Sequence, residues 1–358
     1  MPVSPSPDPP GPTTPRRARE LGLGVGDLLT GPHNAITDVP GIRVGHTTLI
    51  QPPRVHSGVT AIVPDGVGPN TPLPAGVFAG NGYGKLLGTT QLAELGAIET
   101  PVLLTSTLSA FRVADALVGW ILERPEGADV RSLNPVVGEC NDGLLSDIRS
   151  RPIREAHVRA ALETASAGPV AEGSVGAGTG MTALGFKAGI GTSSRRVPLA
   201  GGEALLGVLV QANFAGTLRI SGRTISPADV GVPAGDPGPE TGSCMIVTAT
   251  DAPLDARQLT RLARRSVYAL ARVGAGYGHG SGDYGLALGT RQLSTAAGPA
   301  VVPDAVLDPL FLAVLDAVEE AVLNSLLTAT RVTGPQGHTR YPLPAAPLLA
   351  LLGGGPGS

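Results

Sequence analysis

Lysine is almost missing from this sequence. Lys85 and Lys187 are the only two lysines in 358 residues, arginine supplies the remaining positive side chains, and the formal net charge is −3. Proteins that bind nucleic acid or anionic lipid surfaces carry a concentrated positive field. The charge balance therefore argues against both kinds of partner.

Disulfide and metal-binding patterns are missing too. Cys140 and Cys244 are too few for a disulfide framework, and no CxxC spacing occurs. The six histidines form no HxH or HExxH cluster. Because structural zinc sites use ligand spacings of this kind, we expect no metal.

Long apolar runs are also absent. A transmembrane helix needs about 18 or more consecutive apolar residues, and the longest candidate, at 310–327, contains Asp316, Glu319 and Glu320. The Pro-rich start of the chain lacks the apolar centre of a signal peptide. We therefore expect a disordered arm over residues 1–20 and a soluble, cytoplasmic protein without a membrane segment.

The rest of the chain alternates short β-rich runs with amphipathic helices. Apolar and β-branched content predicts strands at residues 58–66, 100–107, 203–214 and 243–250. Helices are predicted after the second and fourth strands, near residue 152 and from Asp308, and the glycine-dense stretch 172–196 suggests a hairpin. Strands covered by helices on both faces indicate a layered α/β sandwich. No repeat or linker divides residues 21–350, so we expect one domain.

The strand SCMIVTAT begins with Ser243, directly after Gly242. One interpretation is structural: a serine opens the strand after a turn glycine. The other is an N-terminal nucleophile, in which cleavage before Ser243 frees an α-amine with a pKa of about 8. That amine would act as the base for its own hydroxyl, so no histidine is required. Glycine at the scissile position tolerates the strained geometry of an N→O acyl shift.

The glycine-rich loop at 274–285 does not fit a phosphate-binding loop. GxxxxGK[ST] is absent, and the loop follows a helix instead of joining a strand to one. We therefore expect no nucleotide cofactor. Ser281 and Asp283 in this loop are candidates to orient a nucleophile or relay its proton. A flexible loop with a polar tip is the alternative.

Three more polar residues lie in or after apolar runs. Glu139 and Asn141 follow such a run, where a carboxylate can hold a substrate ammonium, although an Asx-type turn also accounts for them. Asn213 lies inside an apolar strand, where its amide must find partners. It is either an oxyanion-hole donor or a structural amide. We expect the neighbouring Cys140 and Cys244 to be small buried packing residues.

Together and in this order, these motifs resemble the L-aminopeptidase D-esterase/amidase family, which includes the β-peptidyl aminopeptidases. The resemblance extends over nearly the whole chain from about residue 32. Its main motifs are GPHNAITDVPGIRVGHTTL, GNGYGKLLGTTQLAELG, NPVVGECNDGLLSDI, GSVGAGTGMTALGFKAGIGTSSR, GSCMIVTATDAPLDARQLTRLARR and HGSGDYGLA.

The resemblance implies a four-layer αββα sandwich and a precursor that processes itself. The cut would fall between Gly242 and Ser243, giving an α chain of residues 1–242 and a β chain of residues 243–358 that stay associated. The implied activity is release of N-terminal residues from short peptides, amino-acid amides or esters, and the implied assembly is a homotetramer.

The resemblance also implies a role for each candidate residue. Ser243 would be nucleophile and base, with Ser281 and Asp283 as its supporting pair. Asn213 would donate to the oxyanion. Glu139, with Asn141 near it, would bind the amino group of the substrate.

Two departures and three alternatives remain at this point. Asn141 stands where some members have tyrosine, and FAG follows Asn213 where FG is common. An acyltransferase of the ornithine acetyltransferase type and an endo-amidase like the nylon-oligomer hydrolases share the sandwich, but these characteristically use a threonine nucleophile. A glycine-rich ligand-binding protein that never cleaves itself is the non-enzymatic alternative.

Overall fold

The chain folds around two β-sheets that lie face to face. The computed structural model describes residues 15–199, 202–233, 242–291 and 301–353. The first sheet has the strand order β1-β2-β6-β7-β4. Its strands are β1 (Ile42–Gln51), β2 (Val55–Pro64), β4 (Leu86–Leu87), β6 (Val102–Ser106) and β7 (Val136–Cys140).

The second sheet contains the strand that opens with Ser243. Its order is β10-β11-β14-β15-β3-β5. Its strands are β3 (Leu73–Gly82), β5 (Ala97–Ile98), β10 (Ile190–Leu199), β11 (Gly202–Asn213), β14 (Ser243–Thr250) and β15 (Gly282–Gly289). β14 runs antiparallel to β11 and parallel to β15. All eight residues of β14 are buried, as expected for a strand covered on both faces.

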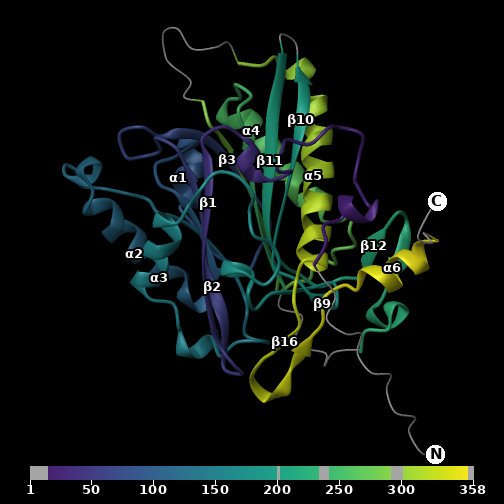
Figure 1. The fold of residues 1–358 in the computed structure, drawn as a ribbon. Coiled ribbons are helices and arrows are strands. Elements are labelled where there is room, and N and C mark those ends of the chain that lie inside the picture. The colour runs from purple at the N-terminus through teal and green to yellow at the C-terminus, as the bar shows by residue number, and fades with distance from the viewer. Residues whose placement is uncertain (1–14, 200–201, 234–241, 292–300, 354–358) are drawn as a thin grey trace, which may run out of the picture.

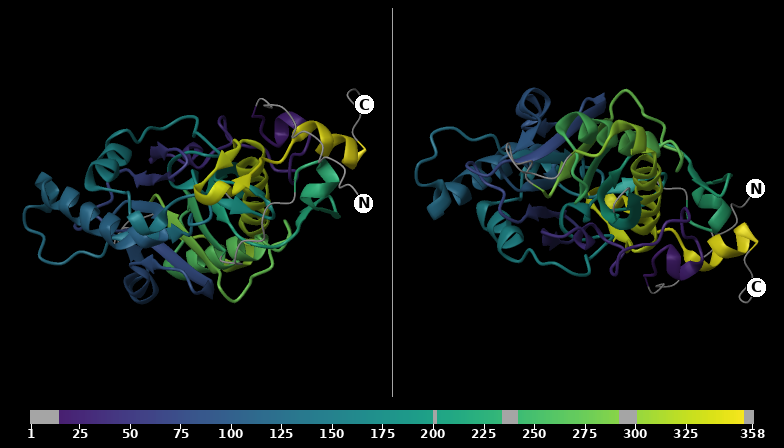
Figure 2. Two further views of the ribbon diagram at one scale, coloured as in Figure 1. Left: turned by 90° about the horizontal axis from the view of Figure 1, so that it is seen from below. Right: turned by 90° about the horizontal axis from the view of Figure 1, so that it is seen from above.

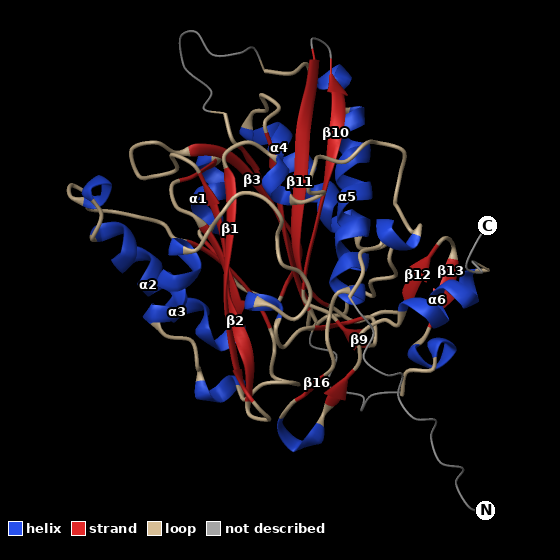
Figure 3. Ribbon diagram, viewed as in Figure 1, coloured by secondary structure: helices blue, strands red, loops and turns tan. Residues whose placement is uncertain are grey.

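Helices cover the outer face of each sheet. α2 (Ala110–Leu122) and α3 (Glu155–Glu163) pack on the first sheet, and α4 (Ala256–Ala269) and α5 (Asp308–Leu327) pack on the second (Figure 1, Figure 3). The predicted αββα sandwich is therefore confirmed. α1 (Thr89–Leu95) contacts β3, and α6 (Ala345–Leu352) lies at the opposite end of the molecule from α2 and α3 (Figure 2). None of the helices formed by the described residues has the length and apolar character of a transmembrane segment.

Alternation along β14 divides its side chains between two apolar cores. Cys244 and Ile246 belong to the core under α4 and α5, whereas Met245 and Val247 belong to the core between the sheets. Because strand side chains alternate with period two, Ser243 shares the face of Met245. The hydroxyl therefore lies at the end of the inter-sheet layer.

The stretch 172–196 does not form the single hairpin predicted for it. It contains a 3₁₀ turn at Gly176–Gly178, a two-residue pair of β8 (Thr182–Ala183) with β9 (Phe186–Lys187), and then β10. The long partner of β10 is β11, which lies outside this stretch. Two further pairs are β12 (Leu218–Ile220) with β13 (Arg223–Ile225) and β16 (Val332–Thr333) with β17 (Thr339–Arg340).

The predicted disordered arm ends earlier than residue 20. Residues 1–14 lie outside the described residues, but Arg19–Leu21 is a 3₁₀ helix and Ala18 is fully buried. Arg17 donates hydrogen bonds to the carbonyls of Asn34 and Thr192. The prediction is therefore wrong for residues 17–20, because long-range polar contacts order them.

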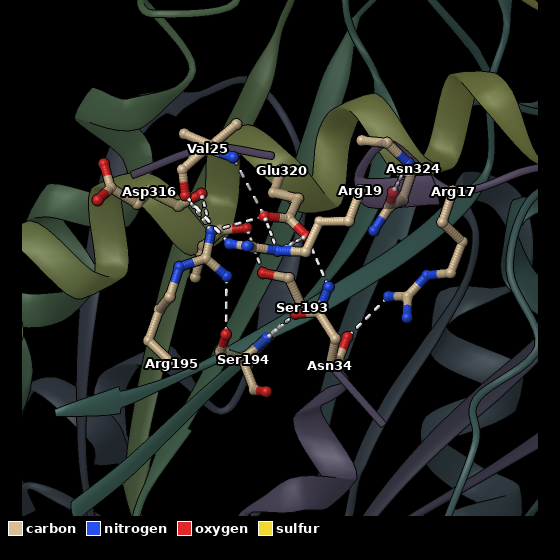
Figure 4. A network of polar contacts seen from close by, with 12 residues as sticks. Arg17, Arg19, Val25, Asn34, Ser193, Ser194, Arg195, Asp316, Glu320 and Asn324 are labelled. Atoms are coloured by element: carbon tan, nitrogen blue, oxygen red, sulfur yellow. Dashed lines mark hydrogen bonds and ion pairs between the residues drawn. The ribbon is translucent and has the colours of Figure 1, made fainter. Parts of the chain in front are cut away.

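These contacts belong to a buried polar network on α5 (Figure 4). Glu320 pairs with Arg19 at 2.9 Å and with Arg195 of β10 at 2.8 Å. Asn34 Nδ2 also donates to Glu320, and the Ala18 N–H donates to Asn324 Oδ1. Glu320 and Arg195 are completely buried, so each depends on the other for compensation of its charge.

Replacing Glu320 by glutamine should destabilise the fold strongly. Glu320→Gln leaves the buried Arg195 guanidinium without its counter-charge, a loss of about 3–5 kcal/mol in the free energy of unfolding. Urea unfolding followed by the fluorescence of the single tryptophan, Trp120, measures it.

The matched control is Glu203→Gln. It breaks the Arg196–Glu203 pair, whose atoms are 2.7 Å apart but whose side chains are both exposed. Exposed pairs contribute at most about 1 kcal/mol. Equal losses in the two variants would contradict the role given to Glu320.

Candidate active site

Strand pairing on both sides fixes the position of Ser243. The residue lies opposite Asn213, the last residue of β11, and opposite Gly282, the first residue of β15. The residue as a whole is 5% exposed. β14 and β15 begin at the end of the sheet where β11 finishes. Three segments that are far apart in the sequence therefore meet at this end.

The carbonyl oxygen of Gly242 accepts two hydrogen bonds. Ser243 Oγ donates at 2.7 Å, and the backbone N–H of Gly282 donates at 3.2 Å. The hydroxyl thus lies against the carbonyl of the peptide bond before it, while the second donor polarises that carbonyl. Sequence reasoning did not single out Gly282, because its contribution comes from the backbone; its place between Ser281 and Asp283 was the only signal.

Crowding explains why residue 242 is a glycine. A Cβ at this position would lie 3.0 Å from Phe214 Cα and 3.2 Å from Ser281 Oγ. The close approach of Phe214 and Ser281 therefore favours glycine at this position.

Ser281 and Asp283 form a hydrogen-bonded pair next to Gly242. Ser281 Oγ donates to Asp283 Oδ1 at 2.9 Å. Asp283 Oδ2 is buried and has no hydrogen-bond partner among the described residues. Burial raises the pKa of Asp283, and the bond from Ser281 acts in the opposite direction. A carboxylate with one open oxygen is suited to accept a proton relayed through the Ser281 hydroxyl.

The side-chain amide of Asn213 has a fixed orientation. Its Oδ1 accepts a hydrogen bond from the N–H of Thr182 at 3.0 Å, which leaves Nδ2 as the end that can donate. Asn213 and Thr182 line a cavity of about 670 Å³. The Asn213 amide therefore offers a hydrogen-bond donor on the neighbouring strand, directly opposite Ser243.

Glu139 is fully buried, and both of its carboxylate oxygens have partners. Oε1 accepts from the backbone N–H of Lys85 at 2.8 Å and lies 3.7 Å from the Lys85 ammonium. Thr107 Oγ1 donates to Oε2. Burial raises the pKa of Glu139, and the contacts with Thr107 and Lys85 oppose that rise. Neither partner was predicted, although Lys85 is one of only two lysines.

Asn141 lies in the wall of a cavity that Asn213 also lines. Glu139 does not line this cavity. Its Oδ1 accepts the N–H of Gly143 at 2.8 Å, which is the Asx-type turn considered from the sequence.

Both cysteines are buried beside the site, as predicted. Cys140 Sγ donates to the carbonyl of Ser243 across the two sheets, at 3.4 Å. Burial raises the pKa of both the Cys140 and the Cys244 thiols well above the usual value, so neither is an activated nucleophile. No three His, Cys, Asp or Glu side chains within the described ranges are arranged to hold a metal ion.

Comparison with known proteins identifies the relatives of this chain. The sequence model described as Peptidase family S58 matches residues 34–340. The chain belongs to peptidase family S58. A β-peptidyl aminopeptidase, BapA, of Sphingosinicella microcystinivorans is 38% identical, over 94% of this chain and 91% of that protein.

Solved structures of other aminopeptidases superpose closely on this chain. A β-aminopeptidase of a Burkholderia species gives a TM-score of 0.85 at 40% identity, covering 94% of this chain and 98% of that chain. The L-aminopeptidase D-Ala-esterase/amidase of Ochrobactrum anthropi, a prototype for the serine aminopeptidases with a variant of the N-terminal-nucleophile hydrolase fold, gives 0.84 at 38% identity, with the same coverage.

These relationships decide between the functional alternatives. This member of family S58 is an aminopeptidase and a serine N-terminal-nucleophile hydrolase, which confirms the predicted family, fold and enzyme class. The acyltransferase, endo-amidase and non-enzymatic alternatives are not supported.

The family resemblance implies that Glu139 binds the amino group of the substrate, and its raised pKa then predicts how that binding depends on pH. A carboxylate must be ionised to hold an ammonium, so affinity for an amine should fall as the pH drops through a pKa above the ordinary glutamate value. The pH dependence of the inhibition constant of a simple amino alcohol measures it. Glu139→Gln should bind weakly at every pH, and a wild-type profile that stays flat down to pH about 4 would contradict the assignment.

Proposed function

We propose that this S58 aminopeptidase cuts itself between Gly242 and Ser243 and then releases N-terminal residues from short peptides, amino-acid amides and esters. The contact of Ser243 Oγ with the Gly242 carbonyl, at 2.7 Å, carries the proposal. The Gly282 N–H supports it, because that donor lies where negative charge develops when the carbonyl is attacked.

Self-cleavage needs only groups that are already in place. Ser243 Oγ bonds to the Gly242 carbonyl carbon, the C–N bond between the two residues breaks, and the hydroxyl proton ends on the released α-amine. Water then hydrolyses the Gly242 ester, which leaves a carboxylate on Gly242 and restores the Ser243 hydroxyl. Ser281 and Asp283 are placed to carry protons during these steps.

Substrate hydrolysis would reuse the same hydroxyl. The new α-amine takes the proton of Ser243 Oγ as the hydroxyl attacks the substrate carbonyl, and it returns that proton to the leaving amine. Asn213 Nδ2 donates to the oxyanion of the tetrahedral intermediate. Water then releases the acyl group from Ser243 and completes the cycle.

Recognition of a free amino group would make the enzyme exo-acting. Glu139 is the buried carboxylate available for this ammonium, with Lys85 and Thr107 fixing its orientation. The relatives are named for β-peptidyl substrates and for L-amino-acid peptides with D-alanine esters and amides. We propose substrates of this class, with the ammonium as the shared feature.

The two fragments would stay together after the cut. β14 and β15 of the β chain lie between β11 and β3 of the α chain in one sheet. Glu320 and Asn324 of the β chain also bind the N-terminal segment and β10 of the α chain. These contacts exist before cleavage, so processing requires no reassembly.

The proposal also covers the oligomeric state of the protein and its place in the cell. We include in the proposal the homotetramer that the family resemblance implies. Light scattering measures that state. Two unpaired buried thiols fit a reducing, cytoplasmic location.

Ser243→Ala should remain one band on a denaturing gel and should release nothing from aminoacyl p-nitroanilides. The variant lacks the oxygen that attacks, so both self-cleavage and turnover are lost. Cys244→Ala is the control at the adjacent buried position, and it should still be cut and active. A cleaved or active Ser243→Ala protein would overturn the proposal.

Asn213→Ala should slow turnover without abolishing it. Loss of one oxyanion donor typically costs about 10²–10³ in kcat. The comparison is made on processed enzyme with p-nitroanilides, by kcat and KM separately. An unchanged kcat would remove Asn213 from the oxyanion site.

A further inference from the structure

The cavity beside Asn213 contains a cation without a counter-charge. Arg54 and Arg149 both line it, and Arg54 pairs with Asp147 at 3.0 Å. Arg149 makes no ion pair or side-chain hydrogen bond with any other residue that the structure describes. Asp147 is the only acidic residue among the described residues of the lining. The wall therefore carries one unmatched positive charge in a protein of net charge −3.

Asp147 both neutralises Arg54 and holds the turn that carries Arg149. Its Oδ1 accepts the N–H of Ser150 at 3.3 Å and so caps the 3₁₀ helix Ile148–Ser150. Its own N–H donates to the carbonyl of Arg54 at 2.8 Å. The backbone that carries Arg149 is thus held by the hydrogen bonds of Asp147 with Ser150 and with Arg54.

The cavity that Arg149 lines also reaches Asn213, the strand partner of Ser243. Asn213 and Thr182 lie in one part of its lining, next to Ser243, and the β16–β17 hairpin at the lower edge of Figure 1 contributes Gln336 and His338. Its volume of about 670 Å³ is within the range of sites that enclose small organic ligands. The cavity therefore has room for a leaving group of one or two residues.

We propose that Arg149 binds a carboxylate of the substrate, that of the free C-terminus of a short peptide. This inference rests on the proposed function, because it places the peptide between Glu139 at its ammonium and Arg149 at its carboxylate. Guanidinium groups match carboxylates in shape and charge. An acidic side chain offers the same chemistry, and the experiment below separates the two sources.

The test compares dipeptides that differ only at the C-terminus. Hydrolysis of a dipeptide acid and of its C-terminal amide is measured in processed wild-type enzyme and in Arg149→Gln, as the ratio of kcat/KM for acid to amide. A general loss of activity cancels in this ratio. Wild type should favour the acid, and Arg149→Gln should lower the ratio about three- to tenfold.

Two further variants make the comparison specific. Arg149→Lys keeps the charge and should retain part of the preference. Arg131→Gln removes an equal charge from an exposed position outside the cavity and should keep the wild-type ratio. The preference should also shrink with added salt, because the guanidinium is exposed. Equal ratios in wild type and Arg149→Gln for every substrate pair would overturn the proposal.

A second pair of substrates identifies the source of the carboxylate. Glutamyl and glutaminyl p-nitroanilides have no C-terminal carboxylate. An effect of Arg149→Gln on the ratio of their kcat/KM values would assign the site to an acidic side chain. An effect on the dipeptide pair alone would assign the site to the C-terminus. Failure of the proposed function itself looks different, since wild type would then release no product from any of these substrates.

Discussion

Two hydrogen-bond donors hold the carbonyl of Gly242, and strand pairing fixes the position of each donor. The parallel pairing of β14 with β15 brings the Gly282 N–H to this oxygen, and the register of β14 turns the Ser243 hydroxyl onto it. Antiparallel pairing with β11 places Asn213 opposite the same residue. A slip of one residue would turn Ser243 to the other face of the sheet, so the site depends on register above all.

The register is itself secured by burial on both faces of β14. Met245 packs between the sheets, and Ile246 packs under the helices. A slip in register would exchange the residues of the two cores, and both cores would lose packing. Across the molecule, Glu320 joins α5 to β10 and to the N-terminal segment. The proposed cut before Ser243 would leave these contacts in place, because none of them passes through that bond.

Sequence reasoning reached the layered fold, the buried strand at residue 243 and the polar segments that meet around it. Those features follow from local patterns of apolar and turn residues, which a single sequence displays. The order of residues 17–20 was missed because its contacts join partners far apart in the chain, as with Asn34 and Glu320, which are 286 positions apart. The same reason hid the Gly282 donor and the partners of Glu139, which come from segments distant in the sequence.

The scarcity of lysine has a practical consequence for the chemistry of this protein. Lys187 is fully buried, with its amine against the carbonyl of Gly178, and burial lowers its pKa to about 7. Lys85 keeps 39% of its side chain exposed, beside Glu139. Amine-directed dyes, biotin esters or resin coupling aimed at lysine side chains would thus react at Lys85, beside the buried carboxylate of Glu139. Labelling that avoids this position can use exposed carboxylates or arginines instead.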